Sequence, residues 1–341
     1  MDEVLLTIGI PTYNRCKLLD GLLNCIANQL NGLNKEEVQI VISDNQSTDD
    51  TKKLVDAYRN NGMLIDYSCN DKNIGANNNI LKIGNELAKG KYCWILGDDD
   101  LIREGGVNHY LNLIRENQDI NVFYLNHTFE SDEIRDEIKE KLPVKQGSLM
   151  CRHGQDELLP NGEAILGYTT QNALFTCISS FIFKKKIWQD NFIGYQTTGT
   201  FEVLSNTFPH SVVLSAQLMR SKVYYVNHPY LAFFVGSQDW FHQWELLLAT
   251  RVLELTDLFE RNGASKGFLK EYRQRIFNDS FNAYYRLYTD VEMPAWFNLE
   301  LKNNIKKYFK YACFRRQLKG LLFFLIKQQI KKLIKHQPPI F

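Results

Sequence analysis

Three consecutive carboxylates, Asp98, Asp99 and Asp100, follow one glycine and an apolar run at residues 92–96. The run has the length and composition of a buried β-strand. Adjacent carboxylates repel one another, so three at a strand end are costly unless a cation or hydrogen-bond donors neutralise them. Mg²⁺ and Mn²⁺ favour such oxygen ligands and typically take one or two protein carboxylates beside substrate phosphates. The cluster therefore indicates a metal and phosphate site; the alternative is a solvated acidic turn before a helix.

The elements that position this cluster alternate between strand and helix. Strands are predicted at 4–10, 38–43, 64–69, 92–96 and 122–125, with helices at about 17–29, 50–58, 76–87 and 104–115. This alternation predicts a parallel sheet with right-handed crossovers and helices on both faces. Ligands bind outside the carboxyl ends of such strands. We therefore expect the loops 12–15, 44–49, 73–79 and 97–100 to converge on one crevice.

The second half of the chain is less regular. Residues 130–162 are polar and weakly patterned, which predicts a mobile insertion or an acceptor-side loop. Further strands are predicted at 177–183, 223–226 and 231–235, a helix at 211–219, and mainly helices from 243 onward. Asn262-Gly263 predicts the end of the first of these last helices.

The charge is unevenly distributed over the 341 residues, a length that predicts two domains or one large domain with an appendage. Residues 301–341 carry eleven Lys/Arg and no acid, whereas residues 1–300 carry a net charge of −10. Basic clusters among Tyr, Phe, Leu and Ile predict a membrane-surface helix, to which each cation adds about 1 kcal/mol near anionic lipid. A solvated charge run is the alternative. The acidic remainder disfavours nucleic acid as a partner.

Targeting signals and cysteines indicate the compartment. Met1-Asp2-Glu3 has no basic region typical of a secretory signal, and the apolar run 321–326 is far shorter than the roughly 20 residues that cross a bilayer. The seven cysteines are odd in number and scattered, which favours reduced thiols. We expect a cytoplasmic protein attached peripherally to the inner face of the cell membrane.

Four motifs together resemble a known family. Ile10-Pro-Thr-Tyr-Asn14-Arg, Ile42-Ser-Asp44-Asn-Gln-Ser-Thr-Asp49, Asn73-Ile-Gly75 and the acidic cluster have the order and spacing of family 2 glycosyltransferases. The chain resembles bacterial O-antigen and capsule enzymes of the abequosyltransferase type over about residues 4–110, and more weakly over 165–240. The resemblance implies an α/β GT-A fold with a mostly parallel sheet. It also implies metal-dependent, inverting transfer of a sugar from a UDP-, CDP-, GDP- or dTDP-linked donor to a hydroxyl of a lipid-linked polysaccharide precursor.

The resemblance also divides the chain and implies a donor site. Residues 1–110 would form the donor half, 111–242 the acceptor-binding and catalytic half, and 243–341 a helical region with the basic tail. The implied donor-binding residues are Pro11, Thr12, Tyr13, Asn14, Arg15, Asp44, Asn73, Gly75, Asn79 and Asp98. In that family the loop 11–15 would run along the base and ribose, and Asp44 would accept a hydrogen bond from the base.

Metal ligands and a catalytic base are implied in the same way. Asp99 would coordinate Mn²⁺ or Mg²⁺ on the donor diphosphate, with Asp100 and His242 as further ligands. The roles of Asp98 and Asp100 stay open between the ribose and ion-bound water, because Gly97 stands where many members have their first acid. His242 belongs to a segment, 236–242, that would close over the diphosphate; the alternative is a surface histidine.

An inverting transfer needs a base that deprotonates the acceptor hydroxyl. His210 stands where the family usually has an acid, and imidazole has a suitable intrinsic pKa. Glu202 is the competing base, and a structural histidine at a helix start is the alternative for His210. Ser179 and Ser180 are expected beside the acceptor or in the core.

Two other function classes remain at this point. The first is a sugar-phosphate nucleotidyltransferase, but its Gly-rich, basic triphosphate loop is missing after the first strand, where Pro11-Thr-Tyr-Asn14 stands. The second is a non-catalytic nucleotide-sugar binding module. The three acids together with Asp44 argue against it.

Overall fold

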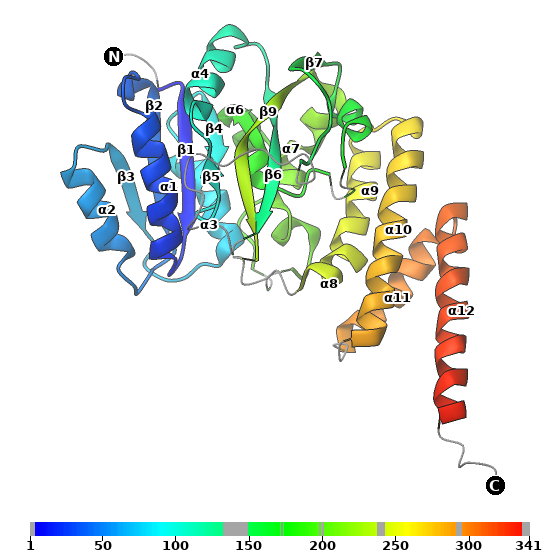
Figure 1. Cartoon of the computed structure of the whole chain (residues 1–341). Coiled ribbons are helices and arrows are strands. Elements are labelled where there is room, and N and C mark those ends of the chain that lie inside the picture. The colour runs from blue at the N-terminus through cyan, green and yellow to red at the C-terminus, as the bar shows by residue number, and fades with distance from the viewer. Residues whose placement is uncertain are drawn as a thin grey trace. The chain divides into compact units, whose positions relative to one another are not determined.

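The computed structural model describes residues 4–131, 149–170, 172, 174–197, 199, 201–236, 243–290 and 295–335 (Figure 1). The chain forms two compact units, which are described separately. The first consists of Met1–Phe241 with Arg261–Ala264, and the second of His242–Glu260 with Ser265–Phe341.

A nine-stranded sheet forms the centre of the first unit. Its strands are β1 (Leu6–Thr12), β2 (Val38–Asp44), β3 (Ile65–Cys69), β4 (Tyr92–Ile95), β5 (Leu101–Ile102), β6 (Val122–Ser131), β7 (Glu157–Leu159), β8 (Phe181–Lys184) and β9 (Val223–Val235). The order is β3-β2-β1-β4-β8-β6-β9-β5, with β7 beside β9. The first four strands are parallel, as the alternation of strands and helices predicts. The other half is mixed, because β8 enters antiparallel between β4 and β6.

Helices connect and cover these strands (Figure 1). They are α1 (Cys16–Gln29), α2 (Thr51–Asn60), α3 (Ala76–Lys82), α4 (Gly106–Glu116), α6 (Lys185–Asp190) and α7 (Pro209–Arg220). In α1 the residues Leu19, Leu22, Leu23 and Ile26 are fully buried at helical spacing, so this face packs on the core. The helix expected to reach residue 87 instead continues after Lys82 as a single π-helical turn, 83–87.

Two predicted strands are a single strand in the structure. Residues 223–226 and 231–235 both belong to β9, which pairs with β6 on either side of a register shift. Leu125 pairs with Val226 and His127 with Leu231, so the residues between them, which include Pro229, lie opposite Asn126 alone. Proline has no N–H for a ladder, which explains both the interruption of the pattern and the bulge.

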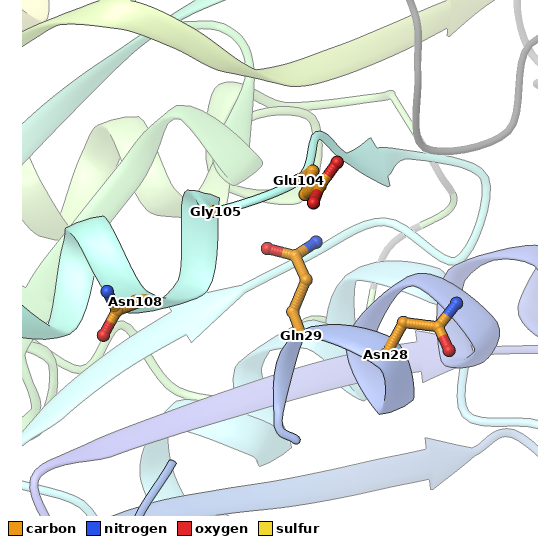
Figure 2. A pocket seen from close by; sticks show the side chains of 5 residues that line it. All are labelled: Asn28, Gln29, Glu104, Gly105 and Asn108. Carbon is orange, nitrogen blue, oxygen red and sulfur yellow. The ribbon is translucent and has the colours of Figure 1, made fainter. Parts of the chain in front are cut away.

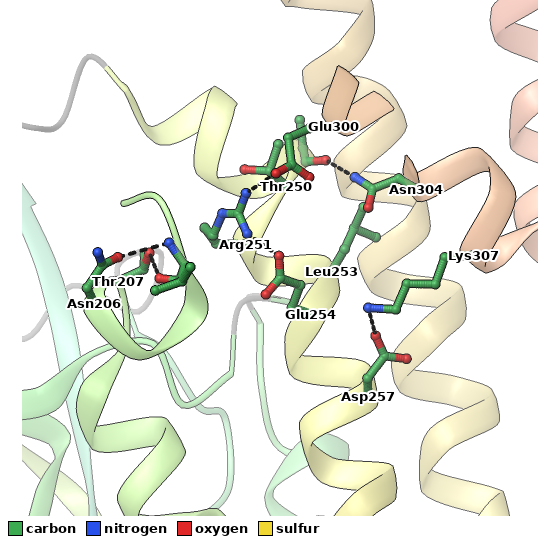
Figure 3. Close-up of polar contacts among 12 residues, drawn as sticks. Asn206, Thr207, Thr250, Arg251, Leu253, Glu254, Asp257, Glu300, Asn304 and Lys307 are labelled. Carbon is green, nitrogen blue, oxygen red and sulfur yellow. Dashed lines mark hydrogen bonds and ion pairs between the residues drawn. The ribbon is translucent and has the colours of Figure 1, made fainter. Parts of the chain in front are cut away.

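The second unit is helical. Its helices are α8 (Trp244–Ala249), α9 (Arg251–Arg261), α10 (Lys266–Asp290), α11 (Ala295–Tyr308) and α12 (Ala312–Lys335). Arg251 is 4% exposed and pairs with Glu254 and, at 2.8 Å, with Glu300 (Figure 3). Lys307 pairs with Asp257 at 2.7 Å. These contacts join α9 to α11. Within the described residues, no helix combines the length and hydropathy needed to span a membrane.

Candidate functional site

The loops predicted to converge meet where the parallel strands β1, β2 and β4 end. Thr12 and Asp44 are paired residues at the carboxyl ends of β1 and β2, and Asp98 is the third residue after β4. The Thr12 hydroxyl donates to Asp98 Oδ2 at 2.7 Å, which brings the first and third of these loops into direct contact. The expectation that polar loops meet at one sheet edge is therefore met by residues 86 positions apart.

The three carboxylates of the acidic cluster are buried and each has a partner. Their exposed fractions are 2% for Asp98, 6% for Asp99 and 3% for Asp100. Arg15 donates to Asp98 Oδ1 at 2.6 Å and to Asp99 Oδ2 at 3.1 Å. The Ser179 hydroxyl donates to Asp100 Oδ2 at 2.8 Å. The alternative of a solvated acidic turn does not fit this burial.

Gly97 explains why no acid stands at the first position of the family motif. A Cβ at Gly97 would lie 2.8 Å from Asp99 Oδ1 and 2.9 Å from Asp100 Oδ2. Any side chain at position 97 would therefore displace the carboxylates of Asp99 and Asp100. Because Gly97 has no side chain, the carboxylates of Asp99 and Asp100 can lie against its backbone. The Gly97 N–H also donates to Ser179 Oγ at 3.0 Å.

The electrostatics of Asp98 depend on its neighbour. Burial raises the pKa of the Asp98 carboxyl to about 7, and the Arg15 guanidinium and the Thr12 hydroxyl oppose this by stabilising the ionised form. Arg15 therefore favours the ionised form of Asp98 but does not cancel the effect of its burial.

The loop that carries Arg15 is locked to the loop after β2. The Asn14 N–H donates to Ser47 Oγ at 2.8 Å, and the Thr48 N–H donates to Asn14 Oδ1 at 2.7 Å. Asn14 adopts φ +53°, a left-handed conformation that asparagine tolerates well. The Cys16 N–H donates to Asp49 Oδ2 at 3.0 Å. Residues 11–15 and 44–49 thus form one hydrogen-bonded platform.

Asp44 is buried under this platform, with 1% of its surface exposed. It accepts the Ser47 N–H at 2.8 Å and a hydrogen bond from the Tyr67 hydroxyl. The burial of Tyr67 and its hydrogen bond to Asp44 raise the pKa of the Tyr67 hydroxyl. Sequence reasoning did not select Tyr67, because a tyrosine in a short strand is more often a packing residue.

Predicted donor residues also lie in the loop before α3 and in α3 itself. Asn79 accepts the Ser43 hydroxyl at 2.7 Å and donates to the Ser43 carbonyl at 2.7 Å. Asn73 Oδ1 accepts the Gly75 N–H at 2.9 Å and an amide N–H of Asn45 at 2.8 Å. Gly75 has φ +85°, which suits only glycine. Of the remaining predicted donor residues, Pro11 is half-buried and Tyr13 is 42% exposed.

His210 lies in the first turn of α7 and is 4% exposed. Its Nε2 is 3.2 Å from the Phe175 carbonyl oxygen, which can only accept, so the ring carries its proton on Nε2. Burial lowers the pKa of His210 to about 3. The imidazole is neutral at physiological pH, as a base must be, but has little proton affinity. Glu202, by contrast, is exposed, and His242 lies outside the described residues.

A second buried histidine, His127, lies behind the acidic cluster. Its Nδ1 is 3.1 Å from the Leu125 carbonyl oxygen and 3.3 Å from Ser180 Oγ. Burial lowers the pKa of His127 to about 4. Ser180 thus faces a core histidine, whereas its neighbour Ser179 faces the acids. The sequence expectation left these two environments open.

The acidic cluster fits a hard divalent cation. In the part of the chain that the structure describes, no three His, Cys, Asp or Glu side chains converge closely enough to enclose a metal ion. A Mg²⁺ or Mn²⁺ ion needs only one or two carboxylates when a substrate supplies phosphate oxygens. Asp98 and Asp99 already share one cationic group, Arg15.

One cavity of about 300 Å³ lies elsewhere, at the end of α1 and the start of α4 (Figure 2). Its lining residues are Asn28, Gln29, Glu104, Gly105 and Asn108. Gln29 donates to the Ile102 carbonyl at 2.9 Å and accepts the Val107 N–H at 3.1 Å. The amide thus ties β5 to α4, and no predicted donor residue lines this cavity.

Comparisons with known proteins give the relatives of the chain. The sequence model of glycosyl transferase family 2 matches residues 7–192, which contain the acidic cluster and the donor loops. The chain is also 26% identical over 337 residues to abequosyltransferase RfbV of Salmonella typhimurium, covering 94% of this chain and 93% of that protein.

Solved structures show the same fold. TarS 1–349 of S. aureus, in complex with UDP-GlcNAc, has a TM-score of 0.62 and 17% identity, covering 89% of this chain and 80% of that one. The mannosyltransferase PcManGT of Pyrobaculum calidifontis, in complex with GDP-Man and Mn²⁺, has a TM-score of 0.50 and 14% identity, covering 99% of this chain and 89% of that one. The expected α/β GT-A fold is thereby confirmed.

The burial of His210 predicts a pH dependence of stability. Because its folded-state pKa of about 3 lies below the unfolded value, the unfolded chain binds more protons as pH falls below about 6.5. Acidification from pH 7 to pH 5 should cost about 2 kcal/mol through this residue. Urea unfolding of His210→Gln should show a loss smaller by that amount. His109, whose ring is 30% exposed, gives the control variant His109→Gln, which should retain the loss. An unchanged loss in His210→Gln would mean that the imidazole is solvated.

Proposed function

The chain belongs to glycosyl transferase family 2, and we propose that it is a metal-dependent, inverting member of that family. As a glycosyltransferase it takes its sugar from a nucleotide-sugar donor. We propose a hexose or deoxyhexose as the sugar and a hydroxyl of a lipid-linked surface-polysaccharide precursor as the acceptor. The family match leaves no support for the nucleotidyltransferase or the non-catalytic alternative. The buried acidic cluster at the strand ends carries the proposal.

The proposed division of labour follows from burial and contacts. The platform of residues 11–15 and 44–49 would hold the nucleotide, because its loops are mutually hydrogen-bonded and lie at the strand ends. Asp99 and Asp100 would bind the divalent ion, and Asp98 would orient Arg15. When bound, the ion would neutralise the diphosphate leaving group. His242 remains a proposed further ligand.

Two residues are proposed for the base. Glu202 is exposed and carries a carboxylate, so an acceptor hydroxyl can reach it. His210 is the alternative, but its pKa must rise when the acceptor binds, because a buried imidazole with a pKa of about 3 is a weak base. The environment therefore favours Glu202 over His210.

Donor binding should depend on Asp99. We expect one of UDP, CDP, GDP or dTDP to stabilise the protein against heat only with Mn²⁺ or Mg²⁺, by roughly 2.7 kcal/mol at 100 times its Kd. Asp99→Asn should abolish this metal-dependent melting shift and the transfer activity. Asp56→Asn, which removes an exposed carboxylate paired with Lys52, is the control and should retain both. Full activity of Asp99→Asn would disprove the metal assignment.

Loss of the catalytic base should lower kcat and leave donor binding unchanged. Glu202→Gln should lower kcat by roughly 10²- to 10⁴-fold, the usual contribution of general-base catalysis, and leave donor-induced melting shifts unchanged. His210→Gln should retain most of the activity, because glutamine can still donate to the Phe175 carbonyl. The reverse result, with His210→Gln inactive and Glu202→Gln active, would identify His210 as the base.

The C-terminal helix supports a membrane partner. In α12 the exposed apolar residues Leu322, Phe323 and Ile326 are 51%, 69% and 59% exposed. Arg315, Arg316, Lys319 and Lys327 share this face at helical spacing, whereas Phe314, Leu318 and Leu321 are buried. Mixed apolar and cationic exposure suits the surface of an anionic bilayer. We propose that this helix attaches the enzyme peripherally to the inner face of the cell membrane.

Point variants test this without removing helices. Phe323→Ser with Ile326→Ser should weaken cosedimentation with vesicles of anionic phospholipid, because each buried CH₂ contributes about 0.8 kcal/mol. Leu64→Ser changes a residue of the first unit that is 63% exposed, and it should bind as the unaltered protein does. Raised salt should also weaken binding, because exposed charges are screened. Equal binding by all variants would rule out α12 as the attachment surface.

A further inference from the structure

Arg15 holds Asp99, a proposed metal ligand, together with the neighbouring carboxylate of Asp98. Its Nη1 is 2.6 Å from Asp98 Oδ1 and its Nη2 is 3.1 Å from Asp99 Oδ2, so one guanidinium spans two acids. We propose that Arg15 is an internal counter-cation, which stands in for the divalent ion while the donor site is empty and swings away when the ion enters. This inference rests on the proposed function, because it requires Asp99 to be a metal ligand.

The constraint behind the proposal is charge. Asp98, Asp99 and Asp100 are each at least 94% buried, so their charges need compensation whether or not a ligand is bound. A guanidinium donates N–H groups along the oxygen lone pairs that a metal would use. The Arg15 guanidinium and a divalent ion would also repel each other if both were bound to Asp99. Arg15 and the ion should therefore alternate on Asp99 rather than share it.

The backbone on both sides of Arg15 is fixed, so this exchange requires only a side-chain movement. The N–H of Asn14 is bound to Ser47 Oγ at 2.8 Å and the N–H of Cys16 to Asp49 Oδ2 at 3.0 Å. The Arg15 side chain itself is 22% exposed, in contrast to the 3% and 8% of the side chains of Asp98 and Asp99. The side chain therefore reaches solvent, and it can rotate outward while the loop stays in place.

The alternation has a consequence for ligand binding. A tethered guanidinium competes with the ion at high effective concentration. Hydrogen bonds to charged partners are worth roughly a factor of ten or more in an equilibrium constant. The protein alone should therefore bind Mn²⁺ weakly. A donor diphosphate helps to displace Arg15 from the acids, because it offers the guanidinium another anion.

The experiment measures the affinity for Mn²⁺ alone, without nucleotide, from the electron paramagnetic resonance signal of the free ion. Arg15→Gln should bind Mn²⁺ at least about tenfold more tightly than the unaltered protein, because the competitor is gone. Arg15→Lys, which keeps a cation, should bind much less tightly than Arg15→Gln. Lys52→Gln removes an exposed cation paired with Asp56 and should leave the affinity unchanged. Asp99→Asn in the Arg15→Gln background should abolish the gain.

The outcomes distinguish a failure of the counter-cation from a failure of the proposed metal site. Equal or weaker Mn²⁺ binding by Arg15→Gln, with measurable binding by the unaltered protein, would overturn the counter-cation and leave the proposed metal site standing. Absence of Mn²⁺ binding in every variant would overturn the counter-cation, and its absence also in the presence of a nucleoside diphosphate would overturn the proposed metal site. If Arg15→Gln does not fold, the Nε–Hε resonance of Arg15 in the unaltered protein, assigned with Arg15→Lys, decides the matter. It should shift on addition of Mg²⁺ alone, and a resonance that stays in place at saturating Mg²⁺ would contradict the exchange.

Discussion

Burying three carboxylates at the end of one strand is the constraint on which the rest of this site depends. Water no longer stabilises their charges, so the protein must supply donors from elsewhere. Thr12 is the last residue of β1, Arg15 comes from the loop after it, and Ser179 comes from the short helical turn before β8. The parallel arrangement of β1 and β4 and the antiparallel insertion of β8 are what bring these donors to one place.

The donor side of the crevice is built by side chains that bond to backbone. Asn14 and Asp49 tie the loop after β1 to the loop after β2. Asp44 closes its own loop, and Asn79 ties α3 to β2. Such preorganisation reduces the reorganisation needed when a charged ligand binds. It also leaves movement to individual side chains, of which the Arg15 side chain, 22% exposed, is the clearest case.

The helical second unit follows a different rule. Arg251, which is buried, pairs with acids from its own helix and from α11, and Lys307 is likewise paired with Asp257 (Figure 3). Lys307, one of the cations of residues 301–341, thus has an acid as its partner. The cations of α12 among the described side chains are a separate group, because they surround exposed apolar residues rather than acids.

The sequence by itself determined the parallel half of the sheet, the polar loops at its carboxyl edge and the family. Each of these depends on local patterns: apolar runs of strand length, helical spacing and short motifs. Only the tertiary structure decided that Arg15 bridges Asp98 and Asp99, that Ser179 holds Asp100, that Tyr67 binds Asp44, and that His210 is buried against a backbone carbonyl. These contacts join residues 23 to 84 positions apart. Their energies depend on burial and on distance in space, and a pattern along the chain carries neither.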